Sequence, residues 1–226
     1  MNVLIACEES QRVCIEFRKR GHNAFSCDLQ NCSGGHPEWH INKNVFDVLN
    51  GYTIFKTQDR TIYTIDGHWD LIIAHPPCTY LTTAATQCHS LKCYSDSEII
   101  VRTYDRLDAM RFFMDIMNSN CPRIAIENPT GVMNTCYRKP DQIIQPYYFA
   151  ENTDSEDYVT KRTCLWLKNL PLLTYEENRP NPMDNAETWG SGKKKNWTES
   201  NHGSVLRSKT FIGVARAMAE QWGDLQ

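Results

Sequence analysis

The chain has 226 residues, of which 41% are hydrophobic and 23% charged, and its formal net charge is −3. These values suit one globular α/β domain over residues 1–226, and they exclude a disordered or fibrous protein. A protein that clamps long duplex DNA usually carries a basic surplus, so any contact with nucleic acid must come from a local patch, or the substrate must be small.

The first part of the chain predicts a βαβ unit. Its elements are a strand, an amphipathic helix and a second strand, over residues 2–7, 9–20 and 23–27. The second strand stops at Asp28, where nucleotide-binding units often place an acid that hydrogen-bonds a ribose. The turn after the first strand has no glycine and carries Glu8 and Glu9. Two carboxylates would repel a pyrophosphate, so a positively charged nucleoside fits better than a dinucleotide or ATP.

The rest of the chain alternates apolar runs with irregular segments. Residues 51–67 predict a β-hairpin insertion, because β-branched or aromatic residues alternate there with polar ones. Further strands are expected over residues 69–74, 121–127 and 163–167, a long helix over 96–118 and a closing helix over 210–222. Mostly loop-like structure, with one short helix near 45–49, is expected over residues 33–50, 81–95 and 130–150. Residues 170–208 hold most of the late Pro, Gly and Asn, which indicates a long excursion outside the core.

Two polar motifs directly follow buried strands. Pro76-Pro77-Cys78 follows the strand over 69–74, and Glu127-Asn128 follows the next strand. The carboxyl ends of parallel strands are where open α/β sheets bind ligands. The two prolines fix φ, so the thiol is presented by stiff backbone. A cysteine nucleophile and a carboxyl group on neighbouring strand ends form a candidate pair for covalent catalysis.

These motifs, behind a βαβ start that ends at Asp28, resemble the catalytic pair of the cytosine-5 DNA methyltransferases, and most closely the small phage-type members. The resemblance implies a Rossmann-like, S-adenosylmethionine-dependent methyltransferase fold, with a mixed sheet and helices on both faces. It also implies the chemistry. Cys78 adds to carbon 6 of a cytosine in DNA, Glu127 hydrogen-bonds ring nitrogen 3, and carbon 5 takes the methyl group from S-adenosylmethionine.

The same resemblance implies further site residues. Pro77 and Asn128 are expected beside the base, and residues 158–163 look like the basic motif that holds it, through Lys161 or Arg162. The residues expected to line the S-adenosylmethionine pocket are Glu8, Ser10, Asp28, Asp47 and Pro76.

No apolar run reaches the length of a membrane span, and the first strand lacks the flanks of a signal peptide. We therefore expect a protein without a membrane partner in the cytoplasm, which is the host cytoplasm if a phage encodes it. The ten cysteines are then expected as thiols. Two clusters are weaker candidates for zinc, and no metal site is expected at either; they are Cys27, Cys32, His36 and His40, and Cys88, His89 and Cys93.

Residues 170–208 stand where this family has a large target-recognition domain, and they are too few for an independent one. They are expected to form a reduced recognition loop, in which Lys193, Lys194 and Lys195 lie near tryptophans. The substrate is then DNA read with low specificity, including single strands, or a free pyrimidine nucleotide modified by the same Cys and Glu. A third hypothesis is a catalytically silent relative that binds a nucleotide or a protein, because the first turn lacks glycine.

Overall fold

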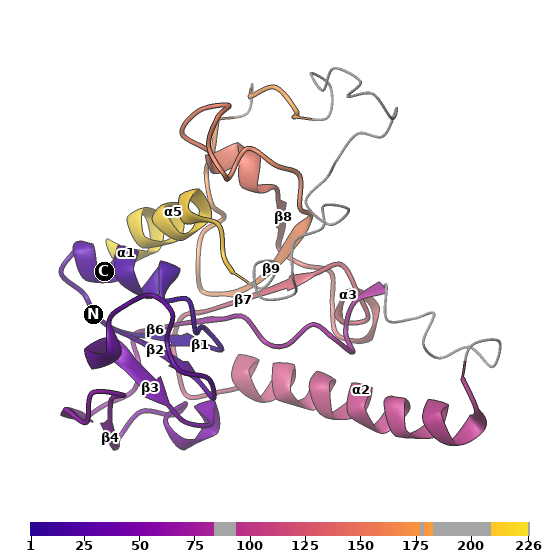
Figure 1. Ribbon diagram of the computed structural model, residues 1–226, viewed down its shortest axis with the longest axis horizontal. Coiled ribbons are helices and arrows are strands. Elements are labelled where there is room, and N and C mark those ends of the chain that lie inside the picture. Colours follow the sequence, from indigo (N-terminus) through magenta and orange to yellow (C-terminus); the bar gives the residue numbers. More distant parts are fainter. Residues whose placement is uncertain (84–93, 177–178, 183–208, 226) are drawn as a thin grey trace.

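The computed structural model describes residues 1–83, 94–176, 179–182 and 209–225. A seven-stranded mixed sheet forms its centre, with the order β3-β2-β1-β6-β7-β9-β8 (Figure 1). The parallel strands are β1 Asn2–Ala6, β2 Asn23–Asp28, β3 His40–Asn42, β6 Leu71–Ala74 and β7 Ile124–Pro129. Strand β9 Thr163–Lys168 runs antiparallel to both of its neighbours, β7 and β8 Gln142–Ile144. The expected α/β class and mixed sheet are confirmed.

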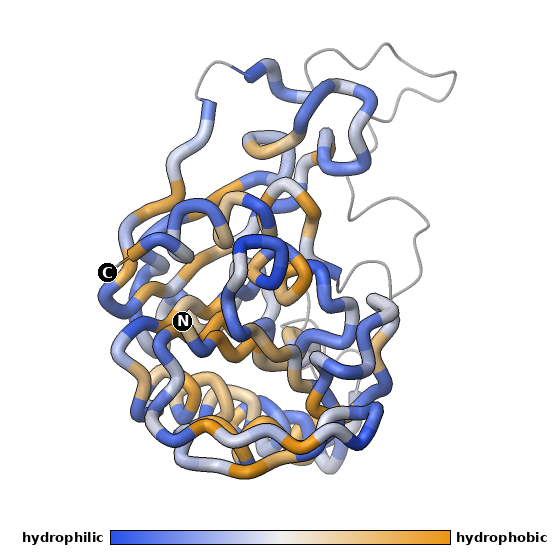
Figure 2. Tube along the Cα trace, turned by 90° about the vertical axis from the view of Figure 1, so that its left-hand side faces the viewer, coloured by the Kyte–Doolittle hydropathy of each residue, from blue (hydrophilic) through white to orange (hydrophobic). Residues whose placement is uncertain are grey.

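Helices cover both faces of this sheet. Helices α1 Arg12–Lys19 and α5 Ile212–Gly223 pack on one face, and α2 Asp96–Met117 lies on the other (Figure 1). Because side chains alternate along a strand, Val3 and Ile5 of β1 pack in the core between the sheet and helices α1 and α5. Leu4 and Ala6 pack in the core on the other face, which helix α2 covers. Strands buried on both faces read as continuous apolar runs, and Figure 2 shows these runs gathered in the middle of the molecule.

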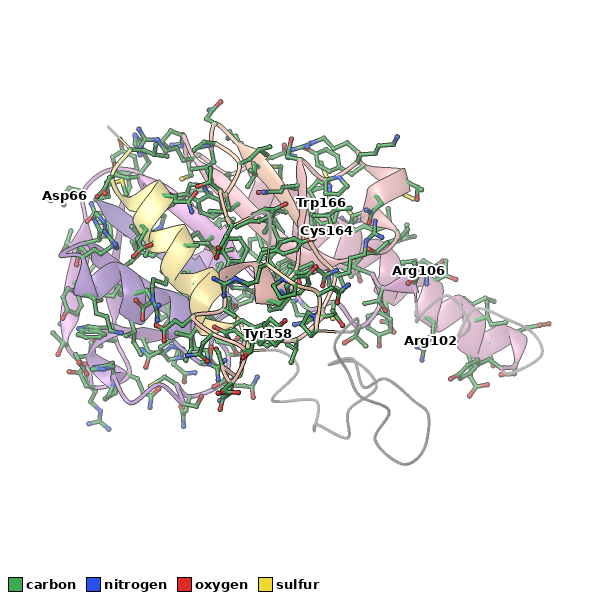
Figure 3. The ribbon with its side chains drawn as sticks, turned by 90° about the horizontal axis from the view of Figure 1, so that it is seen from above. Asp66, Arg102, Arg106, Tyr158, Cys164 and Trp166 are labelled. Atoms are coloured by element: carbon green, nitrogen blue, oxygen red, sulfur yellow. The ribbon has the colours of Figure 1, made fainter. Side chains whose placement is uncertain are left out.

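Helix α2 follows the predicted range closely, but only its carboxyl-terminal part is core. Phe113 and Ile116 are fully buried, whereas Ile100 and Leu107 are 56% and 51% exposed. The apolar residues at helical spacing therefore do not all share the core. The helix extends past the edge of the sheet, as Figure 3 shows for the part that carries Arg102 and Arg106, so no core lies beneath its first turns.

The predicted loops contain short elements that the sequence did not indicate. They are β3, β8, the helix α3 Met133–Cys136 and the 3-10 helices η1 Pro37–Trp39 and η4 Pro146–Phe149. Each has four residues or fewer, which is too short for a periodic pattern. The short helix near residue 45 is the 3-10 helix η2 Val45–Asp47. Within residues 51–67, β4 Thr53–Lys56 and β5 Ile62–Ile65 pair as a separate antiparallel sheet.

Two predicted segments fall largely outside the described residues. Of the predicted recognition loop, residues 183–208 are not described, nor are residues 84–93 of the segment before α2. Among the residues that are described, no helix is both long and apolar enough to cross a membrane.

The ends of β6 and β7 are joined by backbone contacts that we call the strand-end clamp, formed by Pro76, Leu81, Thr82, Asn128 and Gly131. The Asn128 side-chain amide donates to the carbonyl of Pro76 at 2.8 Å. Thr82 and Gly131 form an isolated β-bridge, and the N–H of the next residue, Val132, donates to the Leu81 carbonyl at 2.8 Å. A Cβ on Gly131 would collide with that carbonyl, so only glycine permits this approach.

We predict that Gly131→Ala lowers the free energy of unfolding by about 2 kcal/mol or more, because the added methyl group must push backbone apart. Gly67→Ala is the matched control, since a Cβ there meets no atom of the described residues within 4 Å. The control should stay within about 0.5 kcal/mol of wild type. Urea unfolding followed by circular dichroism measures both values, and equal stability of the two variants would contradict the clamp.

Candidate active site

The candidate site lies where the chain order in the sheet reverses. From β1 the chain moves outward through β2 and β3, and then crosses to β6 on the other side of β1. Open α/β sheets bind ligands beyond the carboxyl ends of the strands at such a point. In the sheet register, Ala6 is paired with Cys27 and with Ala74, and Ala74 with Ile126. The residues that follow these four in the chain therefore share one edge; they are Cys7, Asp28, His75 and Glu127.

Glu127 is a buried carboxylate with an imidazole beside it. Its Oε2 lies 3.1 Å from Nδ1 of His75, and the two side chains are 16% and 7% exposed. Burial alone would raise the pKa of Glu127. The hydrogen bond from His75 and the positive charge of Lys161 outweigh burial and hold that pKa below its usual range. Glu127 is therefore ionised at neutral pH.

Lys161 and Arg162 were equivalent candidates from the sequence, and the structure separates them. Lys161 is half-buried, and its ammonium lies 5.6 Å from the ring centroid of Phe211. Its charge lowers the pKa of Glu127, whereas Arg162 is exposed. The cation at this edge of the sheet is thus Lys161.

Cys78 is exposed at the end of the Pro-Pro turn, between an exposed Pro77 and the Leu81 turn. Its carbonyl accepts the N–H groups of Leu81 and Thr82 at 3.0 and 3.1 Å, which continues the turn into the clamp. Pro76 is buried, and its carbonyl is bonded to Asn128. Pro76 was predicted at the cofactor and Asn128 at the base, and the bond between them fixes the turn that carries the thiol.

Glu8 points into α1 instead of toward the edge of the sheet. The side chain is 3% exposed, and its two oxygens accept the N–H groups of Val13 and Cys14 at 2.7 and 3.2 Å. An internal carboxylate thus takes the first-turn amides that hold phosphate in many nucleotide-binding proteins. Burial raises the pKa of Glu8, against the opposing effects of His75 and the amides. Ser10, the other residue predicted in this turn, is also buried, at 6% exposure.

The turn without glycine still follows a backbone path that favours glycine. Cys7 and Gln11 both adopt left-handed conformations with φ 59°. The buried Gln11 side chain compensates by bonding to His36, donating to its carbonyl at 2.8 Å and accepting from its N–H at 3.0 Å.

The acids Asp28 and Asp47 gather at the end of β2. The pKa of the Cys27 thiol is raised to about 12, mainly by burial and further by the negative charges of these two acids. Both acids therefore lie near that side chain. Asp28 accepts the N–H of Gln30 through Oδ1 at 2.9 Å, and Asp47 is exposed.

Apolar side chains stand next to these two acids in the chain. Leu29 is 75% exposed and Phe46 is 40% exposed. The sequence analysis missed both, although an exposed apolar residue directly beside a loop acid is a readable signal for a nucleoside site. It also missed His75, whose signal is its place directly before Pro-Pro-Cys.

The first candidate zinc cluster does not assemble. His40 has Nδ1 at 2.8 Å from the Ser26 hydroxyl and Nε2 at 2.8 Å from the Gln30 carbonyl, so both ring nitrogens are engaged. Among the described residues, no group of three or more His, Cys, Asp or Glu could hold a metal ion. Cys88, His89 and Cys93 lie outside those residues.

No protein-family model matches the chain, and no curated protein matches it.

We predict that iodoacetamide at pH 8 alkylates Cys78 and leaves Cys27 and Cys121 unmodified in the folded protein. Burial raises the pKa of these two thiols to about 12 and about 11, so about one in 10³ or fewer is a thiolate at pH 8. Exposed Cys136 is the control for alkylation that depends only on solvent exposure of the thiol. Peptide mass spectrometry over time measures each site. Alkylation of Cys27 as fast as Cys78 would contradict the burial.

Proposed function

We propose that the protein transfers a methyl group from S-adenosylmethionine to carbon 5 of cytosine in DNA, through a covalent adduct of Cys78. One observation carries the proposal. An exposed thiol on a clamped turn shares a sheet edge with a buried, ionised Glu127 and with Lys161. The resemblance of these motifs to the cytosine-5 DNA methyltransferases supports the assignment, and so does the mixed α/β sheet.

The residue types suit the chemistry. Carbon 5 of cytosine is a weak nucleophile until a soft nucleophile has added to carbon 6. As the Cys78 sulfur forms its bond to carbon 6, the thiol proton passes through solvent to ionised Glu127, which shares it with ring nitrogen 3 on the opposite side of the ring and returns it to solvent when the product base forms. The ammonium of Lys161 holds the base carbonyl oxygen. After carbon 5 is methylated, its proton leaves to solvent, the double bond re-forms and the Cys78 thiolate departs.

S-adenosylmethionine, when bound, supplies the electrophilic methyl group. The residues at the end of β2 fit its adenosine part. Asp28 would accept the ribose hydroxyls and Asp47 the adenine amino group, with exposed Leu29 and Phe46 against the ring. The acidic edge also suits a sulfonium better than a pyrophosphate. Glu8 stabilises α1 in this arrangement and does not contact the cofactor.

The substrate base must reach this edge. In a duplex, the cytosine has to be flipped out at a cost of a few kcal/mol, and single-stranded DNA avoids most of that cost. We therefore expect single strands to be modified at least as fast as duplexes.

Transfer of tritiated methyl groups from S-adenosylmethionine to cytosine-containing oligonucleotides tests the proposal. Cys78→Ser should lower the rate at least about 10³-fold, as removal of other catalytic nucleophiles does. Equal labelling by wild type and Cys78→Ser would exclude the covalent mechanism. Label on deoxycytidine monophosphate and on no oligonucleotide would replace DNA with a free nucleotide as substrate.

The same assay separates the two basic residues. Lys161→Met should lower kcat about 10²-fold, because it removes a cation beside the reacting ring. Arg162→Met should change it less than about fivefold, since an exposed charge contributes about 1 kcal/mol or less. The reverse order would show that Arg162 holds the base.

Calorimetric titration with S-adenosylmethionine tests the cofactor site separately. We expect Asp28→Asn to weaken binding about tenfold, since it removes one charge-assisted hydrogen bond to the ribose. Asp66→Asn is the matched control, because this exposed acid follows β5 of the separate two-stranded sheet. Figure 3 places it at the end of the molecule opposite Arg102. Absence of heat with wild-type protein would favour a silent relative.

A further inference from the structure

His75 is a buried side chain that takes no direct part in the methyl transfer proposed above. Its side chain is 7% exposed, and Nδ1 lies 3.1 Å from Oε2 of Glu127 and 3.5 Å from the Thr210 hydroxyl. Its other nitrogen, Nε2, is buried and has no hydrogen-bond partner among the described residues. The ring thus has one nitrogen engaged and one unsatisfied.

The surroundings determine which nitrogen carries the proton. A neutral imidazole has one N–H, and an ionised carboxylate only accepts hydrogen bonds, so Nδ1 must be the donor to Glu127. A second proton on Nε2 would be a buried donor without an acceptor. Glu8 is near enough for an electrostatic interaction with the ring, but both of its oxygens already accept α1 amides. The geometry therefore favours a neutral ring protonated on Nδ1.

We propose that His75 is a positioning residue that, through Nδ1–H, holds the Glu127 carboxylate ionised and oriented toward the base. This inference rests on the proposed function for its catalytic consequence, although the tautomer itself does not. Glu127 can take the thiol proton only while it is unprotonated. His75 from β6 and Lys161 before β9 act on Glu127, while Glu8 and Thr210 face His75 from the turn after β1 and the start of α5.

The consequence is a specific pH dependence. A carboxyl group whose pKa is lowered in the protein stays ionised until the pH falls through that lowered value. Without His75, burial of Glu127 is opposed by Lys161 alone, so the carboxyl group takes up a proton at higher pH. The acidic limb of the pH–rate profile should therefore move to higher pH.

Two substitutions at this position test the proposal. His75→Leu removes the donor, and His75→Asn places an amide N–H near the position of Nδ1. We expect His75→Leu to lower kcat at pH 7 by about 10- to 100-fold, as for other residues that orient a functional side chain. Its acidic limb should shift upward, and His75→Asn should recover most of the rate and the original limb. Equal losses in both variants, without a shift of the limb, would overturn the positioning role.

Nitrogen-15 NMR of histidine-labelled protein provides a readout that needs no activity. The His75 signals are assigned by their loss in His75→Asn, and they should show a protonated Nδ1 and a bare Nε2 at pH 7. A ring protonated on Nε2 would overturn the inference whatever the activity. A wild-type protein with the expected tautomer but no methyl transfer would instead count against the proposed function alone.

Discussion

The close approach of Gly131 to the Leu81 carbonyl is the constraint on which the rest of the site depends. Cys78 and Glu127 belong to segments about fifty residues apart, and the parallel pairing of β6 with β7 only brings their ends to the same edge. The bridge at Gly131 and the bond from Asn128 to Pro76 then fix one end to the other. The Pro-Pro turn that carries Cys78 is thus held against the end of the strand that carries Glu127, by a backbone bridge and by one buried side-chain amide.

The second organising effect is that two acids with little solvent exposure have different partners and therefore opposite pKa shifts. Glu8 is satisfied by helix amides, and its burial disfavours the charge, whereas Glu127 keeps its charge through an imidazole and an ammonium. His75 lies between them and interacts with both. One acid thereby stabilises the turn and helix at the start of the chain, and the other keeps a negative charge at the carboxyl end of β7. Similar residues at neighbouring strand ends acquire different roles from their partners alone.

Local patterns predicted the framework, and long-range contacts decided the details. Apolar runs gave the central strands and the three main helices within a few residues, and Pro-Pro-Cys marked the strand end. Strands β3 and β8 were missed because three residues carry no period. The choice of Lys161 over Arg162 and the role of His75 depend on residues far away in the chain. The bonds of Glu8 to the first-turn amides of α1 could not be predicted either, because they depend on the exact path of the turn between β1 and α1.

The projecting start of α2 has a consequence for local stability. Its first turns have exposed apolar side chains, and the contacts that stabilise them are the capping box of Ser95 and Glu98 and a few polar or cation–π contacts of Arg102 and Arg106. The last turns pack Phe113 and Ile116 into the core. Amide protons along this one helix should therefore exchange with solvent on a gradient: fast fraying near Asp96, and near Met117 only the slow exchange that accompanies global unfolding. A continuous helix can thus belong to two cooperative units.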